Sequence, residues 1–197
     1  MRSTRWLVSF LVACLGSVAQ AQPPEAGRLL VASPSLDDPN FGRTVLLLLR
    51  HDDDGSAAVA LNRPTWIDPA EAFPNIEALS GYGGTLFFGG PIAPSQLIIV
   101  FDAAGGDAGN ALQVLGSIYV SSDLAMLGGI DSAAAGAPML RLFAGHAEWG
   151  PGQLEAEVEA GNWRVVPAEP ARIFTDEPTD LWQRLPPASD AVTASLR

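Results

Sequence analysis

The chain has 197 residues, of which 48% are hydrophobic and 17% are charged. That apolar content excludes an intrinsically disordered chain, and the length suits one domain around one core. The 22 acidic residues outnumber the 11 basic residues, all of them arginine, which gives a formal net charge of −11. A surface that binds duplex nucleic acid needs clustered cations to displace phosphate counterions, so the composition argues against nucleic acid as a partner.

The first 21 residues have the pattern of a secretion signal. Arg2 and Arg5 precede an apolar run over residues 6–18, and Ala19-Gln20-Ala21 offers the small-x-small pattern that signal peptidase cleaves. The run is shorter than the roughly 20 apolar residues of a membrane-spanning helix. We therefore expect residues 1–21 to be a signal peptide and the mature protein to be periplasmic or secreted. The alternative is that the apolar run is a buried first element of the domain.

Cys14 leaves a second processing route open. Leu11-Val12-Ala13-Cys14 resembles the motif at which bacterial lipoproteins are lipidated, and we expect membrane attachment only if that route is used. Cleavage after Ala21 would instead remove the only cysteine of the chain. The mature protein would then have no disulfide, no thiolate nucleophile and no cysteine-based zinc site.

Short apolar runs separated by turn residues predict a series of strands along the mature chain. Asp52-Asp53-Asp54-Gly55 should close a hairpin, because an Asp-Gly pair suits the positive φ angles of such a turn. Asp37-Asp38-Pro39-Asn40 has the residues of another turn. The strands we expect are residues 29–32, 44–49, 57–61, 85–88, 97–101, 115–120 and 139–144.

Capping and breaking residues predict four short helices. Ser121 or Ser122 can cap the second of them, Pro151 suits a first helical position, and Gly161 suits the end of that third helix. The helices we expect are residues 70–79, a segment that ends at Leu127, residues 151–160 and residues 179–185.

Strands and helices interleave without regular βαβ alternation. This order favours a single mixed α/β or α+β domain over residues 22–185. We expect residues 186–197 to form a flexible C-terminal tail.

Three segments, in this order, resemble the YqgE/AlgH family of bacterial proteins. They are residues 27–45 with His51, Asp54-Gly55 and Leu61-Asn62-Arg63-Pro64 after them, then Phe88-Gly89-Gly90-Pro91, then residues 145–155 with Trp163. The resemblance spans residues 27 to about 185. It implies a compact α+β domain with a small, partly closed, mostly antiparallel sheet flanked by helices. No activity, catalytic residue or cofactor is established for the family, and its regulator label comes from a link to the control of alginate production.

The chain also departs from the family pattern, which puts a shared ligand site in doubt. The family usually has a glycine at position 58, an Arg-Gly pair and a later histidine after Gly-Gly-Pro, and Gly-Tyr-Ala-Gly-Trp in the third segment. Most members also lack a leader. The residues found here at those positions are Ala58, Gln96, Leu97, Phe101, His146 and Glu148.

Glycine and proline residues, which give the backbone unusual conformations, gather on predicted loops, where binding residues are often found. The amides at the start of the predicted third helix could receive an anion. The alternative is a packing motif in which Trp149 fills the core. We expect a non-catalytic binding or regulatory module whose partner is an unknown protein or a small anionic ligand. The candidate binding residues are Asn62, Arg63, Pro64, Gly89, Gly90, Pro91, Trp149, Gly150, Gly152 and Gln153.

The sequence leaves two other functions open, a metal-dependent hydrolase and a transcriptional regulator. His51, His146 and Glu148 could form a two-histidine, one-carboxylate metal site for a hydrolase, or they could be solvated surface residues. The family label would instead suggest a cytoplasmic transcriptional regulator, which conflicts with the leader and with the acidic net charge. We expect no metal, no cofactor and no catalytic residue.

Overall fold

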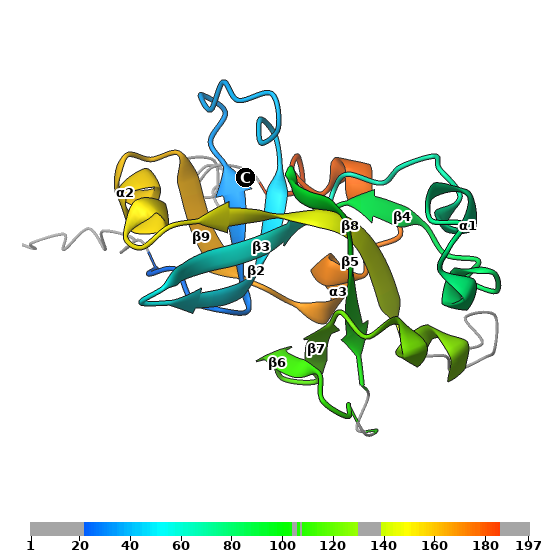
Figure 1. Cartoon of the computed structure of the whole chain (residues 1–197). Coiled ribbons are helices and arrows are strands. Elements are labelled where there is room, and N and C mark those ends of the chain that lie inside the picture. Colours follow the sequence, from blue (N-terminus) through cyan, green and yellow to red (C-terminus); the bar gives the residue numbers. More distant parts are fainter. Residues whose placement is uncertain (1–21, 104–105, 107, 130–138, 186–197) are drawn as a thin grey trace, which may run out of the picture.

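The computed structural model describes residues 22–103, 106, 108–129 and 139–185, and the predicted signal peptide and tail lie outside these residues. The described strands form one continuous, strongly curled sheet (Figure 1). Its strands are β1 (Arg28–Ala32), β2 (Val45–Asp52), β3 (Gly55–Ala60), β4 (Leu86–Phe88), β5 (Ile92–Asp102), β6 (Leu112–Leu115), β7 (Ile118–Ser121), β8 (Leu140–Trp149) and β9 (Trp163–Pro167).

The sheet has the strand order β6-β7-β5-β8-β3-β2-β1-β9, and β4 adds to β8 beside this path. Every pairing between described strands is antiparallel except that of β4 with β8. The first part of β8 lies between β4 and β5, and its last residues pair with β3. Strand β8 therefore joins the two halves of the sheet. The structure is a mixed α+β fold dominated by a mostly antiparallel sheet.

Apolar side chains fill both faces of the sheet. Side chains alternate between the two faces of a strand, so Leu29 and Leu47 point into the concave interior with Phe143, and their neighbours Leu30 and Leu46 point outward. The outer cluster packs against α2 (Gln153–Glu159). A third cluster lies on the other half of the sheet, below η1 (Glu77–Leu79) and η2 (Leu124–Gly129). Because both faces of the sheet are covered, the strands are continuous apolar runs in the sequence.

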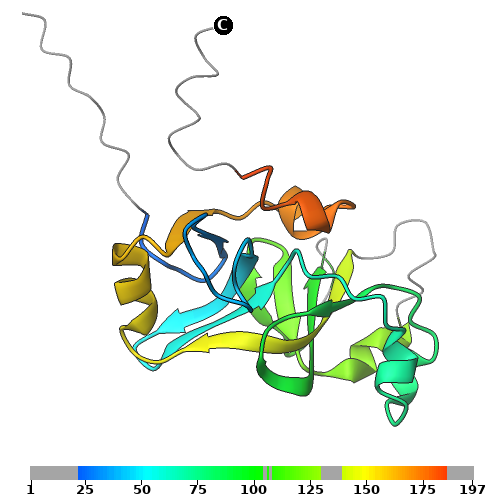
Figure 2. The same ribbon diagram turned by 90° about the horizontal axis from the view of Figure 1, so that it is seen from above.

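The helices are short and occupy little of the chain. Besides α2, they are α1 (Pro69–Ala72), α3 (Pro170–Ile173) and the 3-10 turns η1, η2 and η3 (Pro178–Asp180). Viewed from above, α2 and α1 lie at opposite ends of the sheet, and α3 lies on a third side (Figure 2). The expected flanking helices are thus present only as minor elements. None of the helices in the described part of the chain is long and apolar enough to cross a bilayer.

The predicted hairpin between residues 44–49 and 57–61 is confirmed, since β2 and β3 meet at Asp52 and Gly55. The predicted single strand over residues 115–120 is wrong, because β6 and β7 form a hairpin that turns at Gly116. Gly116 has a φ of 54°, a conformation that glycine adopts without strain, and this reverses the chain inside the apolar run.

Several predicted helices are also corrected. The helix over residues 70–79 is two short elements, α1 and η1, with Pro74 between them. The third helix begins at Gln153 rather than Pro151, because Gly152 adopts a left-handed conformation at its N-cap. The last helix is only the 3-10 turn η3 followed by turns.

Ser121 and Ser122 do not cap the second helix. Instead, Asp123 accepts a hydrogen bond from the amide of Ala125, and η2 is a 3-10 element. Strand β8 continues five residues beyond the predicted Ala144, to Trp149, and neither β9 nor α3 was predicted. The bounds of β9 depend on its pairing with β1, and those of α3 depend on the packing of Ile173 against the interior. Short-range sequence patterns do not encode either contact.

Candidate functional site

Asn62 and Arg63 hold the segment that leads into β2. The side-chain oxygen of Asn62 accepts a hydrogen bond from the amide of Val45 (2.9 Å), and its nitrogen donates to the carbonyl of Arg43 (2.9 Å). The guanidinium of Arg63 donates to the carbonyl of Gly42 (3.0 Å) and to Oγ1 of Thr44 (2.8 Å), whose side chain is fully buried. Both side chains therefore have a structural role in fixing one loop of the sheet.

Pro64 lies next to β4, where it forms a bridge with Phe87. The amide of Phe88 donates to the carbonyl of Arg63 (2.9 Å). The first two predicted segments, Asn62-Arg63-Pro64 and Gly89-Gly90-Pro91, are thus neighbours in the fold although they are distant in the sequence.

Gly89 and Gly90 are buried against the backbone of β8, whereas Pro91 is exposed. The carbonyl of Gly89 accepts a hydrogen bond from the amide of Ala60 (2.9 Å), and its amide donates to the carbonyl of Ala144 (2.8 Å). A Cβ atom at Gly89 would lie 2.1 Å from the carbonyl oxygen of Gly145. This close approach of two backbones joins β3 to β8.

Trp149 fills the outer core under α2, as the packing alternative predicted, and only 4% of its surface is exposed. Its ring contacts Phe41 (ring centroids 6.3 Å apart) and Trp163 (6.0 Å). The indole N–H groups of Trp149 and Trp163 both donate to Oε2 of Glu157, at 3.1 Å and 2.8 Å. One carboxylate of α2 therefore satisfies both buried indoles.

Gln153 closes the turn between β8 and α2. Its side-chain oxygen accepts a hydrogen bond from the amide of Gly150 (3.2 Å), and its nitrogen donates to Oε1 of Glu157 (3.1 Å). Gly152 is the N-cap of the helix. The amide of Gly150, one of those considered for an anion, already has an internal acceptor.

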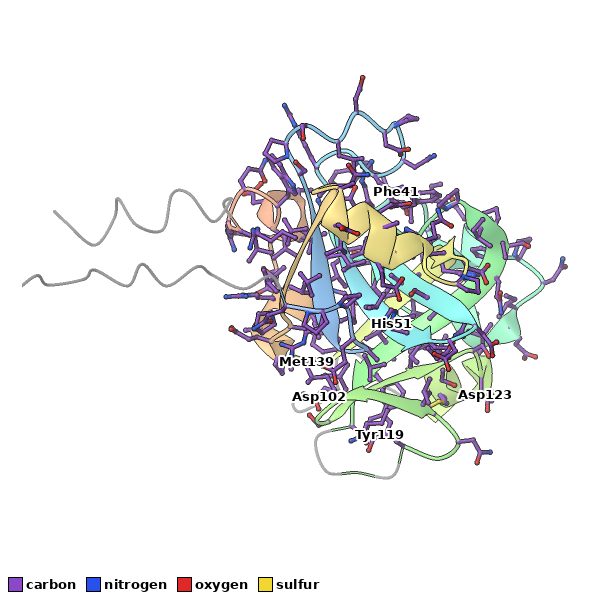
Figure 3. All side chains as sticks on the ribbon, turned by 90° about the vertical axis from the view of Figure 1, so that its left-hand side faces the viewer. Phe41, His51, Asp102, Tyr119, Asp123 and Met139 are labelled. Carbon is purple, nitrogen blue, oxygen red and sulfur yellow. The ribbon has the colours of Figure 1, made fainter. Side chains whose placement is uncertain are left out.

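Phe41 links the Asn62-Arg63-Pro64 segment to the Trp149 segment, and the hydrogen bond from Phe88 to Arg63 joins the Gly89-Gly90-Pro91 segment to them. Asn62 and Arg63 fix residues 42–45, and Phe41 at the start of this loop packs between Trp149 and Trp163. Figure 3 looks onto α2, with Phe41 and His51 labelled on either side of the helix. The motif residues thus form one connected frame, in which most side chains bond to the protein itself.

His51 belongs to the outer face of the sheet. Its Nδ1 lies 2.8 Å from Oγ of Ser56 on the neighbouring strand, and its Nε2 lies 3.6 Å from Oε1 of Glu155 on α2. The three residues resemble a serine, histidine and carboxylate set, but Ser56 is only 1% exposed. A hydroxyl at that depth cannot reach a substrate, so the contacts support a structural role that ties α2 to the hairpin.

His146 and Glu148 are on the opposite face from His51. His51 on β2 pairs with Ser56 on β3, and Ser56 pairs with Trp149 on β8, so the side chains of these three residues lie on one face of the sheet. Glu148 is the neighbour of Trp149 along β8, so its side chain lies on the other face. Nε2 of His146 lies 3.8 Å from Oε2 of Glu148, and its buried Nδ1 has no hydrogen-bond partner among the described residues. The structure therefore does not bring together the three residues proposed for a metal site. The described residues contain no cluster of three or more potential metal ligands.

Two features were not predicted from the sequence. Arg141 lies in β8 within an otherwise apolar run, and only 7% of its surface is exposed. It lines a pocket of about 310 Å³ together with Tyr82, Thr85 and Asp176. Trp66 is the opposite case, an indole that is 99% exposed just after Asn62-Arg63-Pro64. The sequence offered one signal for each feature. Arg141 stands alone between two leucines, and Trp66 lies in a short segment between two prolines.

Comparisons with known proteins agree along almost the whole described chain. A family model described as AlgH-like (DUF179) matches residues 29–187. UPF0301 protein SCO2948 of Streptomyces coelicolor is 43% identical over 164 residues, which cover 81% of this chain and 83% of that protein. UPF0301 protein CAB604 of Chlamydia abortus is 34% identical over 161 residues, covering 82% of this chain and 84% of that protein.

Solved structures show the same fold. The crystal structure of protein DIP2367 from Corynebacterium diphtheriae superposes with a TM-score of 0.69 at 28% identity, covering 86% of this chain and 91% of that one. The solution structure of the AlgH protein from Pseudomonas aeruginosa gives a TM-score of 0.62 at 27% identity, covering 89% of this chain and 96% of that one.

Proposed function

This chain belongs to the AlgH-like family, and we propose that it is a non-catalytic binding module that engages a protein partner through the Trp66 surface. The Trp66 surface comprises Asn62, Arg63, Pro64, Trp66 and Ile67. The observation that carries the proposal is the 99% exposure of Trp66, beside an Ile67 that is 56% exposed. Tryptophan is enriched among the few residues that dominate binding energy at protein interfaces, where its large ring is buried by the partner.

The backbone under Trp66 is held in place, which supports an anchoring role. The amide and the hydroxyl of Thr65 both donate to the carbonyl of Leu86, at 2.8 Å and 2.9 Å. Pro64 forms its bridge with Phe87 on the same strand, β4. A fixed segment loses little conformational entropy when it binds, so more of the contact energy becomes affinity.

The non-catalytic part of the proposal rests on the placement of the titratable groups. Ser56 is buried beneath His51, and His146 lies on the opposite face of the sheet from His51. The hydroxyl beside His51 is therefore inaccessible, and Nδ1 of His146 has no hydrogen-bond partner among the described residues, whereas general-base catalysis needs a base in contact with an accessible nucleophile.

Replacing Trp66 with alanine should weaken partner binding without unfolding the protein. The immobilised mature protein is exposed to an envelope extract of the source bacterium, and a captured protein is identified by mass spectrometry, purified and rebound. We expect at least about a tenfold loss of affinity for W66A, since truncating a central interface tryptophan typically costs about 2 kcal/mol or more. Arg63→Ala is a poor test, because Arg63 also holds the loop at Gly42.

Leu112→Ala is the matched control. Leu112 is as exposed as Ile67 at 56%, but it lies in β6, at the opposite end of the molecule from the segment that joins β3 to α1 (Figure 1). L112A should bind like the unmodified protein. Equal binding by W66A and the unmodified protein would show that the partner does not bind the Trp66 surface.

We further propose that the binding module works in the periplasm after cleavage behind Ala21. The support is the order of charge, apolar run and small residues in residues 1–21. Intact mass of the protein from fractionated native cells should give a periplasmic species that starts at Gln22. A lipidated species starting at Cys14 would place the module on a membrane surface instead. An uncleaved cytoplasmic chain would overturn export and favour a cytoplasmic regulator.

A further inference from the structure

The pocket at Arg141 is formed by segments far apart in the sequence. Its walls come from the start of β8, from residues 82–87 before and within β4, and from residues 174–178 after α3. Its volume of about 310 Å³ is at the lower end of the range for small-molecule sites. The pocket shares no residue with the Trp66 surface, so a ligand site there is independent of the proposed function.

Arg141 places a positive charge in this pocket at high cost. Its guanidinium donates to the carbonyl of Leu61 (3.2 Å) and to that of Thr175, and it lies over the ring of Phe87, 4.6 Å from the centroid. An arginine has five N–H donors, and these two carbonyls carry no net charge to balance the cation. Within the described residues, no carboxylate ion-pairs with Arg141.

Burial lowers the pKa of Arg141 to about 10, while the charge of Asp176 acts in the opposite direction. The guanidinium therefore remains charged at neutral pH. A buried cation without a paired anion is strongly disfavoured, so an oxyanion that entered the pocket would gain a charge-assisted hydrogen bond.

Asp176 gives the pocket a second charge of opposite sign. It is exposed and lines the same pocket, and it forms no ion pair with Arg141 among the described residues. An anion alone would be repelled by this carboxylate. A molecule with a carboxylate at one end and an ammonium at the other would satisfy both groups at once.

The neutral lining of the pocket suits such a molecule. Burial raises the pKa of Tyr82 to about 12, so its phenol keeps its proton and can donate or accept a hydrogen bond. The phenol folds against Gly84, where an added Cβ would lie 2.5 Å from the hydroxyl oxygen. Phe87 and Phe174 supply apolar surface for a short side chain.

We propose that this pocket binds a small zwitterion of the α-amino acid class, with its carboxylate on the guanidinium of Arg141 and its ammonium facing Asp176. The planar guanidinium matches a carboxylate with two parallel hydrogen bonds, which a lysine could not provide. Asp176 selects against simple carboxylates, and the volume limits the ligand to a small molecule.

Nuclear magnetic resonance titration of the full mature chain tests the proposal. The probes are L-alanine, L-leucine, sodium acetate, ethylamine hydrochloride and inorganic phosphate, followed through the backbone amides of residues 82–85 and 174–176. We expect saturable shifts with at least one of the two amino acids, and binding at least about tenfold weaker for acetate and for ethylamine. No saturable shift with either amino acid overturns the proposal, and so does acetate or phosphate binding as tightly as the amino acids.

Asp176→Asn and Asp180→Asn form a matched pair of variants that should both fold, because both residues are exposed. Asp180 lies in η3 outside the pocket lining. We expect D176N to lose about tenfold in affinity for the amino acid while acetate binding is kept or improved, and D180N to behave like the unmodified protein. An equal response of both variants overturns the role of Asp176, and amino-acid binding retained by Arg141→Met overturns that of Arg141.

Discussion

Replacing Gly89 with alanine should lower the free energy of unfolding by about 3 kcal/mol. The new Cβ would lie 2.1 Å from the carbonyl oxygen of Gly145, so two backbones must move apart. Overpacking of this kind costs roughly 1–3 kcal/mol, and weakening the hydrogen bonds to Ala60 and Ala144 adds about 1 kcal/mol for each bond lost. Urea denaturation followed by circular dichroism measures the change, which for a domain of this size corresponds to a melting point lower by roughly 6–12 °C.

Gly83→Ala is the control for this substitution. Gly83 is exposed, and a Cβ built there meets no atom within 4 Å. G83A should change the free energy of unfolding by less than about 1 kcal/mol, and slight stabilisation is the expected sign. If G89A proves as stable as G83A, the Gly-Gly-Pro turn does not need the close backbone contact, and its glycines would have to be explained by a ligand.

Trp149→Ala should destabilise the protein by about 4 kcal/mol. The side chain is 4% exposed, stacks with Phe41 and donates its indole N–H to Glu157, so truncation leaves a cavity and removes one of the two indole hydrogen bonds to that carboxylate. Losses of about 3–5 kcal/mol are typical for removal of a buried large aromatic ring. The measurement is again the free energy of unfolding, with the near-ultraviolet dichroism of the Trp149 and Trp163 pair as a second signal.

Trp66→Ala supplies the comparison, because the same atoms are removed from a ring that is 99% exposed. Its free energy of unfolding should change by less than about 0.5 kcal/mol. A W149A protein as stable as W66A would mean that Trp149 does not support the core, and it would return Trp149 to the set of candidate binding residues.

Local patterns predicted those parts of the protein that depend on neighbours in the chain. The Asp52–Gly55 hairpin follows from turn chemistry alone, and the end of α2 at Gly161 follows from its C-terminal glycine. The single strand over residues 115–120 failed because its apolar run hides a turn at Gly116. The placement of Trp149 in the core could be foreseen as an alternative, but not its pairing with Trp163 through Glu157.

Features of the site that depend on pairing across the sheet could not be predicted from the sequence. His51 and His146 fall on opposite faces because of the register from β2 through β3 to β8, which no spacing in the sequence reveals. The acceptors of Arg141 are the carbonyls of Leu61 and Thr175, which are 80 and 34 residues away along the chain. Likewise, Asn62 and Arg63 were predicted as binding residues, and the hydrogen bonds by which they also hold residues 42–45 could not be foreseen from the sequence.

The most direct test of the central claim is site-specific photo-crosslinking in living cells of the source bacterium. A photoreactive phenylalanine analogue replaces Trp66 in one strain and Leu112 in another, which compares two exposed apolar positions on distant parts of the fold. A binding module that uses the Trp66 surface should give a discrete adduct of one partner protein at position 66 and none of that adduct at position 112. The absence of an adduct at position 66, or the same adducts at both positions, would contradict the proposed binding role.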